Sequence, residues 1–240
     1  MRIPRIYLDL PLHPNTEVPL DERSAHYLGK VLRMKAGMAL TLFNGRGAEC
    51  SGELVSLEKR RGIIRLKDAT TPASESRLHT ILGIGISRGE RMDYVVQKST
   101  EMGVNVIQPL FTEFCEVKLD EKRGEKRRQH WQQVGISAAE QSGRVLIPEV
   151  LPPVSAGSWI KSLACERKYL LDQEQSGELA REPVPEQIAL FIGPEGGMSD
   201  NEKALAVSKG FIGLNLGPRT LRTETAPVAA LSLFQYLWGN

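Results

Sequence analysis

The stretch ALFIGPEGGMSDNE, residues 189–202, changes within a few residues from an apolar run to a glycine-rich polar turn. Ser199 and Glu202 have the spacing of a capping box, which marks the first turn of a helix. A tight strand-to-helix turn accounts for one or two glycines, but less well for three that flank a proline and a glutamate. Paired glycines allow positive φ angles and let the backbone approach a ligand closely. We therefore predict a strand, a ligand-binding loop and a helix.

A second polar loop, LGPRTLRTETAPVAAL at residues 216–231, also lies between an apolar run and a helix. It holds two arginines, a glutamate and three threonines, although a connector can be much shorter. Open α/β sheets hold their ligands at the carboxyl ends of strands. The two loops emerge at the same edge of a parallel sheet and meet if their strands are neighbours. Together they suit a neutral, partly aromatic ligand such as an adenosine moiety.

Apolar runs alternate with helical periodicity through the rest of this half of the chain. Such alternation predicts a parallel sheet that helices cover on both faces, hence an α/β fold. The expected strands are 79–87, 106–111, 168–172, 188–193 and 211–217, and the expected helices are 89–103, 121–143, 199–209 and 226–238.

The first 72 residues have a different pattern, of short strands with one helix. ALTLF and AECSGELVSLE flank NGRG, an Asn-Gly hairpin signal, and GIIRL follows. DERSAHYLGKVLRM, residues 21–34, predicts a short helix. We expect a small β-barrel or sandwich at residues 1–72, with the segment KDATTPASES leading into a second domain at 73–240.

Composition and charge narrow the classes of function. The chain has 240 residues, 41% of them hydrophobic and 25% charged, as in ordinary globular proteins. Residues 1–72 hold 12 basic and 8 acidic residues, which indicates either a polyanion partner or ordinary solvated surface. No apolar run reaches the length of a membrane span, and MRIPRIYLDLPLHP does not resemble a signal peptide. Cys50, Cys115 and Cys165 have no metal-site spacing. We predict a cytoplasmic protein without a metal.

Two nucleotide-binding motifs can be excluded. In GIGISRGE the glycines are Gly83, Gly85 and Gly89, so the third stands one residue too far along for a dinucleotide fingerprint, and no acidic residue follows at the ribose-binding distance. The Gly193–Gly197 loop lacks the Gly-Lys-Ser/Thr of a triphosphate-binding P-loop.

The two polar loops nevertheless resemble a known pair of signatures. IGPEGGMSDNE followed by LGPRTLRTETAPVAAL is similar to the signature segments of the RsmE family, methyltransferases of small-subunit ribosomal RNA in the SPOUT superfamily. The resemblance extends to SRGERMDYVVQKSTEMGV, ISAAEQSGR, HYLGKVLR and RIPRIY, in order and over nearly the whole chain.

The resemblance implies a SPOUT-type domain, a parallel sheet with a deep trefoil knot, after a small PUA-like, RNA-binding β-barrel. It implies S-adenosylmethionine as cofactor and a homodimer with active sites at the subunit interface. The reaction would methylate N3 of a specific uridine in small-subunit (16S) ribosomal RNA near the decoding region. The substrate would be an assembled or nearly assembled subunit, and no membrane would take part.

Matching positions give the candidate site. Arg222 would stabilise the uracil anion, and Glu224 would either accept the proton or serve only as a carboxylate at a helix start. The expected cofactor-binding residues are Leu171, Gly193, Pro194, Glu195, Gly196, Leu216, Gly217, Leu221, Arg222, Thr223, Thr225 and Ala226. The expected RNA contacts are Arg2, Arg5, Lys30, Arg33, Arg88, Lys98 and Arg144, each of which has ordinary surface charge as its alternative reading.

Two other functions remain open at this point. One is a catalytically silent RNA-binding or ribosome-assembly factor on the same fold, although the intact glycine loops disfavour it. The other is a methyltransferase that acts on a different RNA, such as transfer RNA.

Overall fold

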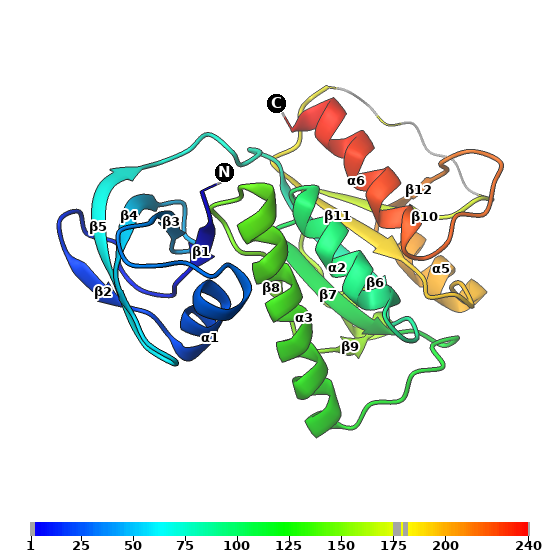
Figure 1. Cartoon of the computed structure of the whole chain (residues 1–240). Coiled ribbons are helices and arrows are strands. Elements are labelled where there is room, and N and C mark those ends of the chain that lie inside the picture. The colour runs from blue at the N-terminus through cyan, green and yellow to red at the C-terminus, as the bar shows by residue number, and fades with distance from the viewer. Residues whose placement is uncertain (1–2, 175–178, 180–181, 240) are drawn as a thin grey trace. The chain divides into compact units, whose positions relative to one another are not determined.

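The computed structural model (Figure 1) describes residues 3–174, 179 and 182–239. Its contacts divide the chain into two compact units: Met1–Glu75 with Ala139–Ile147, and Ser76–Ala138 with Pro148–Asn240. The sequence indicated a boundary between residues 72 and 73. It gave no sign that the segment Ala139–Ile147, far along the chain, packs with the first unit.

The first unit is a five-stranded sheet with one short helical segment. Its sheet order is β1-β3-β4-β5-β2, with β1 parallel to β3 and the remaining pairs antiparallel. The elements are β1 (Arg5–Tyr7), β2 (Glu17–Pro19), α1 (Glu22–His26), the π-helix η1 (Tyr27–Val31), β3 (Ala39–Phe43), β4 (Glu49–Leu57) and β5 (Gly62–Thr70). The expected hairpin is confirmed: β3 pairs with β4 across Asn44, whose side chain accepts a hydrogen bond from the Arg46 backbone (2.9 Å).

The second unit is built on a sheet in which every described strand pair is parallel. The strand order is β12-β10-β11-β6-β7-β8, with β9 also paired to β7. The strands are β6 (His79–Gly85), β7 (Val106–Phe111), β8 (Glu149–Val150), β9 (Val154–Ser155), β10 (Arg167–Leu171), β11 (Gln187–Ile192) and β12 (Phe211–Leu214). The helices are α2 (Arg91–Glu101), α3 (Glu121–Ser142, of which residues 139–142 belong to the first unit), α4 (Ala156–Ser162), α5 (Asp200–Ser208) and α6 (Thr225–Trp238).

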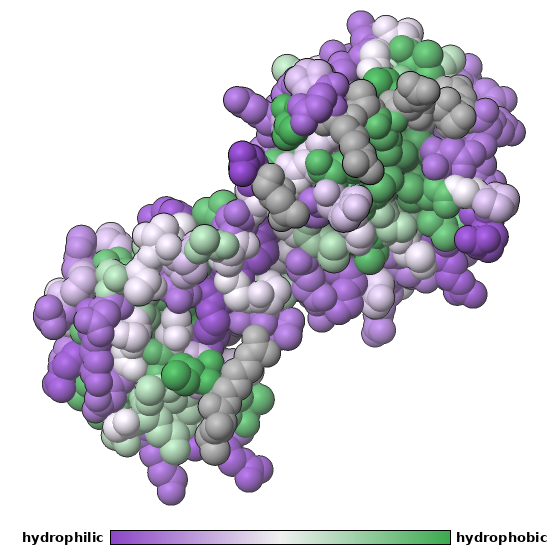
Figure 2. All heavy atoms as spheres, turned by 90° about the horizontal axis from the view of Figure 1, so that it is seen from above, coloured by the Kyte–Doolittle hydropathy of each residue, from purple (hydrophilic) through white to green (hydrophobic). Residues whose placement is uncertain are grey.

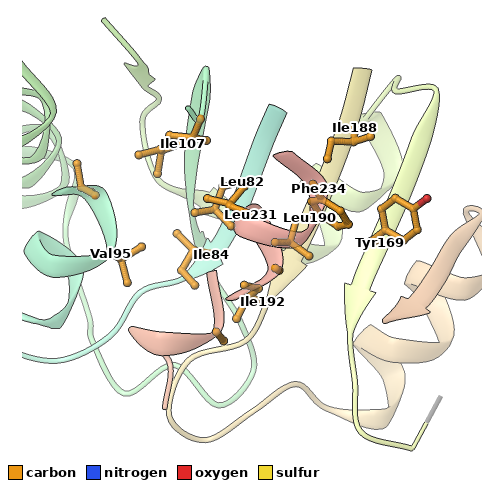
Figure 3. Close-up of a cluster of buried hydrophobic side chains, with 14 of the residues drawn as sticks. Leu82, Ile84, Val95, Ile107, Tyr169, Ile188, Leu190, Ile192, Leu231 and Phe234 are labelled. Atoms are coloured by element: carbon orange, nitrogen blue, oxygen red, sulfur yellow. The ribbon is translucent and has the colours of Figure 1, made fainter. Parts of the chain in front are cut away.

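Alternation along the strands divides the core between the two faces of this sheet, because successive side chains of a strand point to opposite sides. On β11, Leu190 and Ile192 join one cluster and Phe191 joins the other. The larger cluster packs against α2 and α6, as Figure 3 shows for Val95, Leu231 and Phe234. The smaller cluster packs against α4 and α5. The predicted parallel sheet with helices on both faces is thus confirmed.

The helix start that the sequence predicted at Ser199 is confirmed. Ser199 and Glu202 form the capping box of α5, with hydrogen bonds of 3.2 and 3.0 Å. Within the described ranges 3–174, 179 and 182–239, every helix is too short or too polar to cross a bilayer.

The last helix keeps apolar side chains at its surface. Leu231, Phe234 and Trp238 are core residues, but Leu233 and Leu237 are only partly buried, and Tyr236 is 74% exposed. Figure 2 views the molecule from the side of α6 and shows a hydrophobic area on the second unit. Of these six side chains, three belong to the core and three leave apolar surface at the outside of the helix.

Candidate active site

A pocket of about 730 Å³ lies at the carboxyl ends of three strands in the second unit. It is formed by the ends of β10, β11 and β12 and the loops that follow them, together with the first residue of α2, one residue of α5 and one residue of α6. Its lining is partly apolar, with Leu171, Ile192, Leu214, Leu216 and Leu221. A hollow of this size that combines apolar walls with convergent polar groups is typical of a small-molecule site.

The strands that carry the two polar loops are not neighbours, because β10 lies between β11 and β12. The two loops line the same pocket all the same, since all three strands are parallel and end at one edge. The intervening strand adds a third loop: Asp172, Gln173 and Glu174 line the pocket as well. This third loop was not predicted beyond Leu171, although its position directly after a strand was a usable signal.

Hydrogen bonds tie the third loop to the last one. The side chain of Asn215 donates to the carbonyl of Gln173 (2.7 Å) and accepts from the backbone of Gly217 (2.7 Å). The side chain of Gln173 donates to the hydroxyl of Thr220 (3.2 Å). These hydrogen bonds fix the first part of the loop after β12 at the pocket, and the start of α6 fixes its last part.

The loop Gly193–Gly197 passes very close to the end of β6. A Cβ atom at Gly85 would lie 2.3 Å from Cδ of Pro194 and 2.4 Å from its nitrogen, so only glycine allows this approach. Gly197 has a φ of 75°, a conformation that glycine adopts without strain. The Gly85 of the rejected dinucleotide motif therefore has a packing role, and it fixes one wall of the pocket.

Arg91, the first residue of α2, connects the two polar loops. Its guanidinium forms an ion pair with Glu195, and its Nε lies 4.0 Å from Oε2 of Glu224. Glu195 also accepts a hydrogen bond from the backbone of Arg88 (3.1 Å). Partial burial acts to raise the pKa of Glu195, but backbone hydrogen bonds and Arg91 outweigh it and hold the pKa below its ordinary value. Glu195 is thus anionic at neutral pH, and Arg91 is a site residue that was not among those predicted.

Arg222 has a different environment. Its side chain is exposed on the pocket wall and forms no ion pair with any residue in the described ranges. Its carbonyl accepts from the backbones of Thr225 (2.9 Å) and Ala226 (3.0 Å), which starts α6. Glu224 is the N-cap residue but makes no side-chain capping bond. The carboxylate of Glu224 faces Arg91 instead of its own loop, and the guanidinium of Arg222 is left available.

The predicted cofactor-binding residues can now be placed. All except Thr225 line the pocket, as does Glu224; Thr225 is exposed at the start of α6. That these residues bind the cofactor stays a prediction. The lining residues that sequence reasoning missed are Arg91, Asp172, Gln173, Glu174, Ile192, Gly197, Met198, Lys203, Leu214, Arg219 and Thr220.

Two of the predicted RNA contacts have structural partners in the first unit. Arg144 is 4% exposed and pairs with Glu75 at 2.9 Å. Arg5 pairs with Glu49 (2.9 Å), donates to the carbonyl of Arg144 (3.1 Å) and stacks on Phe43. Side chains buried and paired in this way stabilise the unit, so we drop both from the set of RNA contacts that we propose.

The other predicted RNA contacts differ among themselves. Lys30 and Arg33 are exposed and form no ion pair with a described residue. Arg88 pairs with Glu116, and Lys98 pairs with Glu101 at 2.8 Å. Arg2 lies outside the described residues. Among the predicted RNA contacts in the described residues, Lys30 and Arg33 are therefore the two that are exposed and have no ion-pair partner.

Comparison with known proteins decides the family. A family model described as an RNA methyltransferase domain matches residues 74–235, and one described as an RNA methyltransferase PUA domain matches residues 20–67. The chain belongs to the RNA methyltransferase family. The chain has 36% identity to ribosomal RNA small subunit methyltransferase E of Buchnera aphidicola subsp. Schizaphis graminum, over 100% of this chain and 98% of that protein. The enzyme of that name from Bacillus subtilis is 29% identical over 97% of this chain and 96% of its own length.

Solved structures of family members agree with this assignment. Ribosomal RNA small subunit methyltransferase E from Neisseria gonorrhoeae, bound to S-adenosyl methionine, has a TM-score of 0.93 and 38% identity over 99% of both chains. A putative methyltransferase from Legionella pneumophila in complex with the cofactor SAM has a TM-score of 0.96 and 40% identity over 100% of both chains. The expected family, the PUA domain and the α/β methyltransferase domain of the RsmE type are thereby confirmed.

Proposed function

We propose that this family member methylates N3 of a specific uridine in 16S ribosomal RNA near the decoding region, with S-adenosylmethionine as methyl donor. The observation that carries the proposal is the pocket itself. In it Arg222 forms no ion pair with a described residue, and Glu224, which pairs with Arg91, lies beside an apolar lining. The names of the relatives support the substrate class, and the two cofactor-bound structures support the donor.

The pocket has the features that this cofactor requires. Leu171, Leu216 and Leu221 offer apolar contact to an adenine, and the glycines of the Gly193–Gly197 loop let backbone groups come close. Lining carboxylates and amides supply acceptors and donors for its polar groups. The bound cofactor supplies a methyl group already activated on a sulfonium. The task of the protein is therefore alignment and charge stabilisation.

The reacting nitrogen sets the remaining requirements. Uracil N3 is a poor nucleophile while it carries its proton, and its deprotonation spreads negative charge onto the two carbonyl oxygens. Glu224 is the proton acceptor that we propose, held at the pocket by Arg91. Arg222 would donate to a uracil oxygen and stabilise the anion. N3 takes part in base pairing, so the target base must be unpaired or flipped before it can enter.

We further propose the features that the family resemblance implies but the comparisons leave open. These are a trefoil knot in the second unit, a homodimer whose active sites lie at the subunit interface, an assembled or nearly assembled subunit as substrate, and a cytoplasmic location. Tyr236, Leu233 and Leu237 on α6 support the dimer, because exposed apolar surface of this kind is often covered by a partner. Sedimentation velocity at micromolar concentration tests it, and a pure monomer would contradict it.

Nucleoside analysis tests the proposed reaction. Ribosomal RNA from a strain that lacks the gene should contain no 3-methyluridine in the small-subunit RNA, and the purified protein with S-adenosylmethionine should restore it to subunits from that strain. Restoration in transfer RNA instead would establish the alternative substrate. A protein that binds neither S-adenosylmethionine nor its demethylated product would be the silent assembly factor.

Gly85→Ala should weaken cofactor binding about tenfold. The added Cβ overlaps Pro194, and overpacking of this kind strains a site by about 1–3 kcal/mol, which displacement of the Gly193–Gly197 loop would relieve. Isothermal titration calorimetry with S-adenosylhomocysteine measures the change. Gly157→Ala is the control: the nearest side-chain atom to its new Cβ is 3.9 Å away, and α4 tolerates alanine. Equal affinities in the two variants would disprove the packing role.

Replacing Lys30 and Arg33 together by alanine should weaken RNA binding and flatten its salt dependence. Each phosphate contact contributes about one unit to the slope of log affinity against log salt concentration, so the slope should fall by roughly two. Filter binding to a helical fragment of small-subunit RNA at several salt concentrations measures it. Lys67→Ala is the control, because Lys67 is already paired with Glu53 at 2.8 Å. An unchanged slope in the double variant would place the RNA elsewhere.

A further inference from the structure

Asp172 occupies an unusual position in the pocket wall. It directly follows β10. This strand lies between β11 and β12, which carry the two polar loops, so Asp172 lies centrally among the three loops. Its residue surface is only 7% exposed, although carboxylates are almost never buried unless they are paired. Buried polar groups are normally hydrogen-bonded, so each oxygen of this carboxylate is expected to accept a hydrogen bond.

Only one of the two oxygens accepts hydrogen bonds from described residues. Oδ1 accepts from the backbone of Glu174 (3.1 Å) and from Nζ of Lys203 (3.3 Å). Oδ2 lies 3.3 Å from the same Nζ, within ion-pair range, but it has no hydrogen-bond donor among the described residues. A buried acceptor without a donor is destabilising, so a ligand that brings a donor to it gains binding free energy.

The charge around Asp172 selects the kind of donor. Lys203 already supplies a cation next to both oxygens, and the capping box of α5 fixes the helix that carries it. An ammonium group of the ligand would bring a second cation beside Lys203 and would be repelled. A neutral hydroxyl group donates a hydrogen bond without that repulsion. The ribose of an adenosyl ligand carries two such hydroxyls side by side, and acidic side chains accept from ribose hydroxyls in other nucleotide sites.

We infer that Asp172 is the specificity-determining residue for the ribose of the cofactor, and that Lys203 positions its carboxylate. The inference rests on the proposed use of S-adenosylmethionine. Oδ2 accepts from a ribose hydroxyl, while the amino-acid group of the cofactor is bound elsewhere in the pocket. Glu174, which reaches the same lysine at 3.7 Å but is exposed, takes no part in this selection.

A comparison of ligands and variants tests the inference through binding alone. The probes are S-adenosylhomocysteine, its analogue without the two ribose hydroxyls, and methylthioadenosine, which keeps the ribose but lacks the amino-acid group. Calorimetry gives the affinity of each probe for the unaltered protein and for Asp172→Asn. The unaltered protein should bind the analogue without hydroxyls about tenfold to a hundredfold more weakly than S-adenosylhomocysteine, as expected for a lost charge-assisted hydrogen bond.

In Asp172→Asn most of this discrimination against the dideoxy analogue should disappear, while the discrimination against methylthioadenosine should stay as in the unaltered protein. Asp200→Asn is the matched control and should keep both, because Asp200 is exposed on α5 and does not line the pocket. If Asp172→Asn folds poorly, the double variant Asp172→Leu with Lys203→Met replaces the ion pair by apolar side chains and should show the same loss of ribose discrimination.

Each contrary result has its own meaning. Retained ribose discrimination in Asp172→Asn would overturn the inference, and so would a selective loss of discrimination against methylthioadenosine, which would place the amino-acid group at Asp172. An unaltered protein that binds S-adenosylhomocysteine without ribose discrimination would overturn this inference only. An unaltered protein that binds none of the probes would overturn the proposed function as well.

Discussion

Arg222→Ala is expected to lower the turnover number about a hundredfold to a thousandfold, while cofactor affinity and most RNA affinity stay near their original values. This is the loss typical of removing one donor that faces a developing oxyanion. The negative charge on the uracil oxygens grows as N3 loses its proton, so the guanidinium helps the transition state more than the bound substrate. The deficit should therefore appear in kcat and not in KM.

The structure favours this role over a bracing role for Arg222. A brace would pair Arg222 with Glu224 or another carboxylate, and its loss would weaken cofactor binding along with turnover. Glu224 faces Arg91 instead, at 4.0 Å, and Arg222 forms no ion pair with a residue in the described parts of the chain. Arg91 is the side chain that bridges the two loops, through Glu195 and Glu224.

Single-turnover kinetics and calorimetry on the same preparation separate the two roles. Arg222→Lys should recover part of the rate, because it keeps the charge but loses the planar fork of donors. Arg219→Ala removes an exposed arginine from the same loop and should change the rate much less. Near-normal turnover in Arg222→Ala would rule out the catalytic role, and a matched loss of cofactor affinity would favour the brace.

Glu75→Ala is expected to destabilise the first unit by about 3–5 kcal/mol, because it removes the carboxylate that pairs with the buried guanidinium of Arg144. The carboxylate of Glu75 also accepts from the backbones of Val145 (2.9 Å) and Leu146 (3.0 Å). Its removal therefore also leaves two backbone donors unsatisfied and releases the segment that packs with the unit from far along the chain.

Hydrogen exchange read by mass spectrometry is the suitable measurement, because the chain has two units and its unfolding need not be two-state. Peptides from β3, β4 and residues 139–147 should lose protection in Glu75→Ala. Glu17→Ala breaks an exposed ion pair with Arg65 and should change stability by less than about 1 kcal/mol. Protection in Glu75→Ala that matches this control would show that the buried pair contributes little.

Local features of this protein were determined by the sequence alone. The hairpin at Asn44, the capping box at Ser199 and the alternation of apolar runs with helices each depend on residues close together in the chain. The two polar loops were recognisable because glycine and charged residues interrupt apolar strands. Their place at one edge followed from the parallel sheet, since the carboxyl ends of parallel strands lie together.

Contacts between distant segments were decided only by the tertiary structure. Strand β10 lies between β11 and β12, and this order brings Asp172 and Gln173 into the pocket. Arg91 pairs with Glu195 and Glu224, which are more than a hundred positions away along the sequence. Arg5 and Arg144 pair with Glu49 and Glu75, and no local sequence pattern predicts these ion pairs. The identity of a residue as arginine does not show whether its side chain faces solvent or a buried carboxylate. Its role depends on which distant side chains the fold brings within a few ångströms, and spacing along the chain does not contain that information.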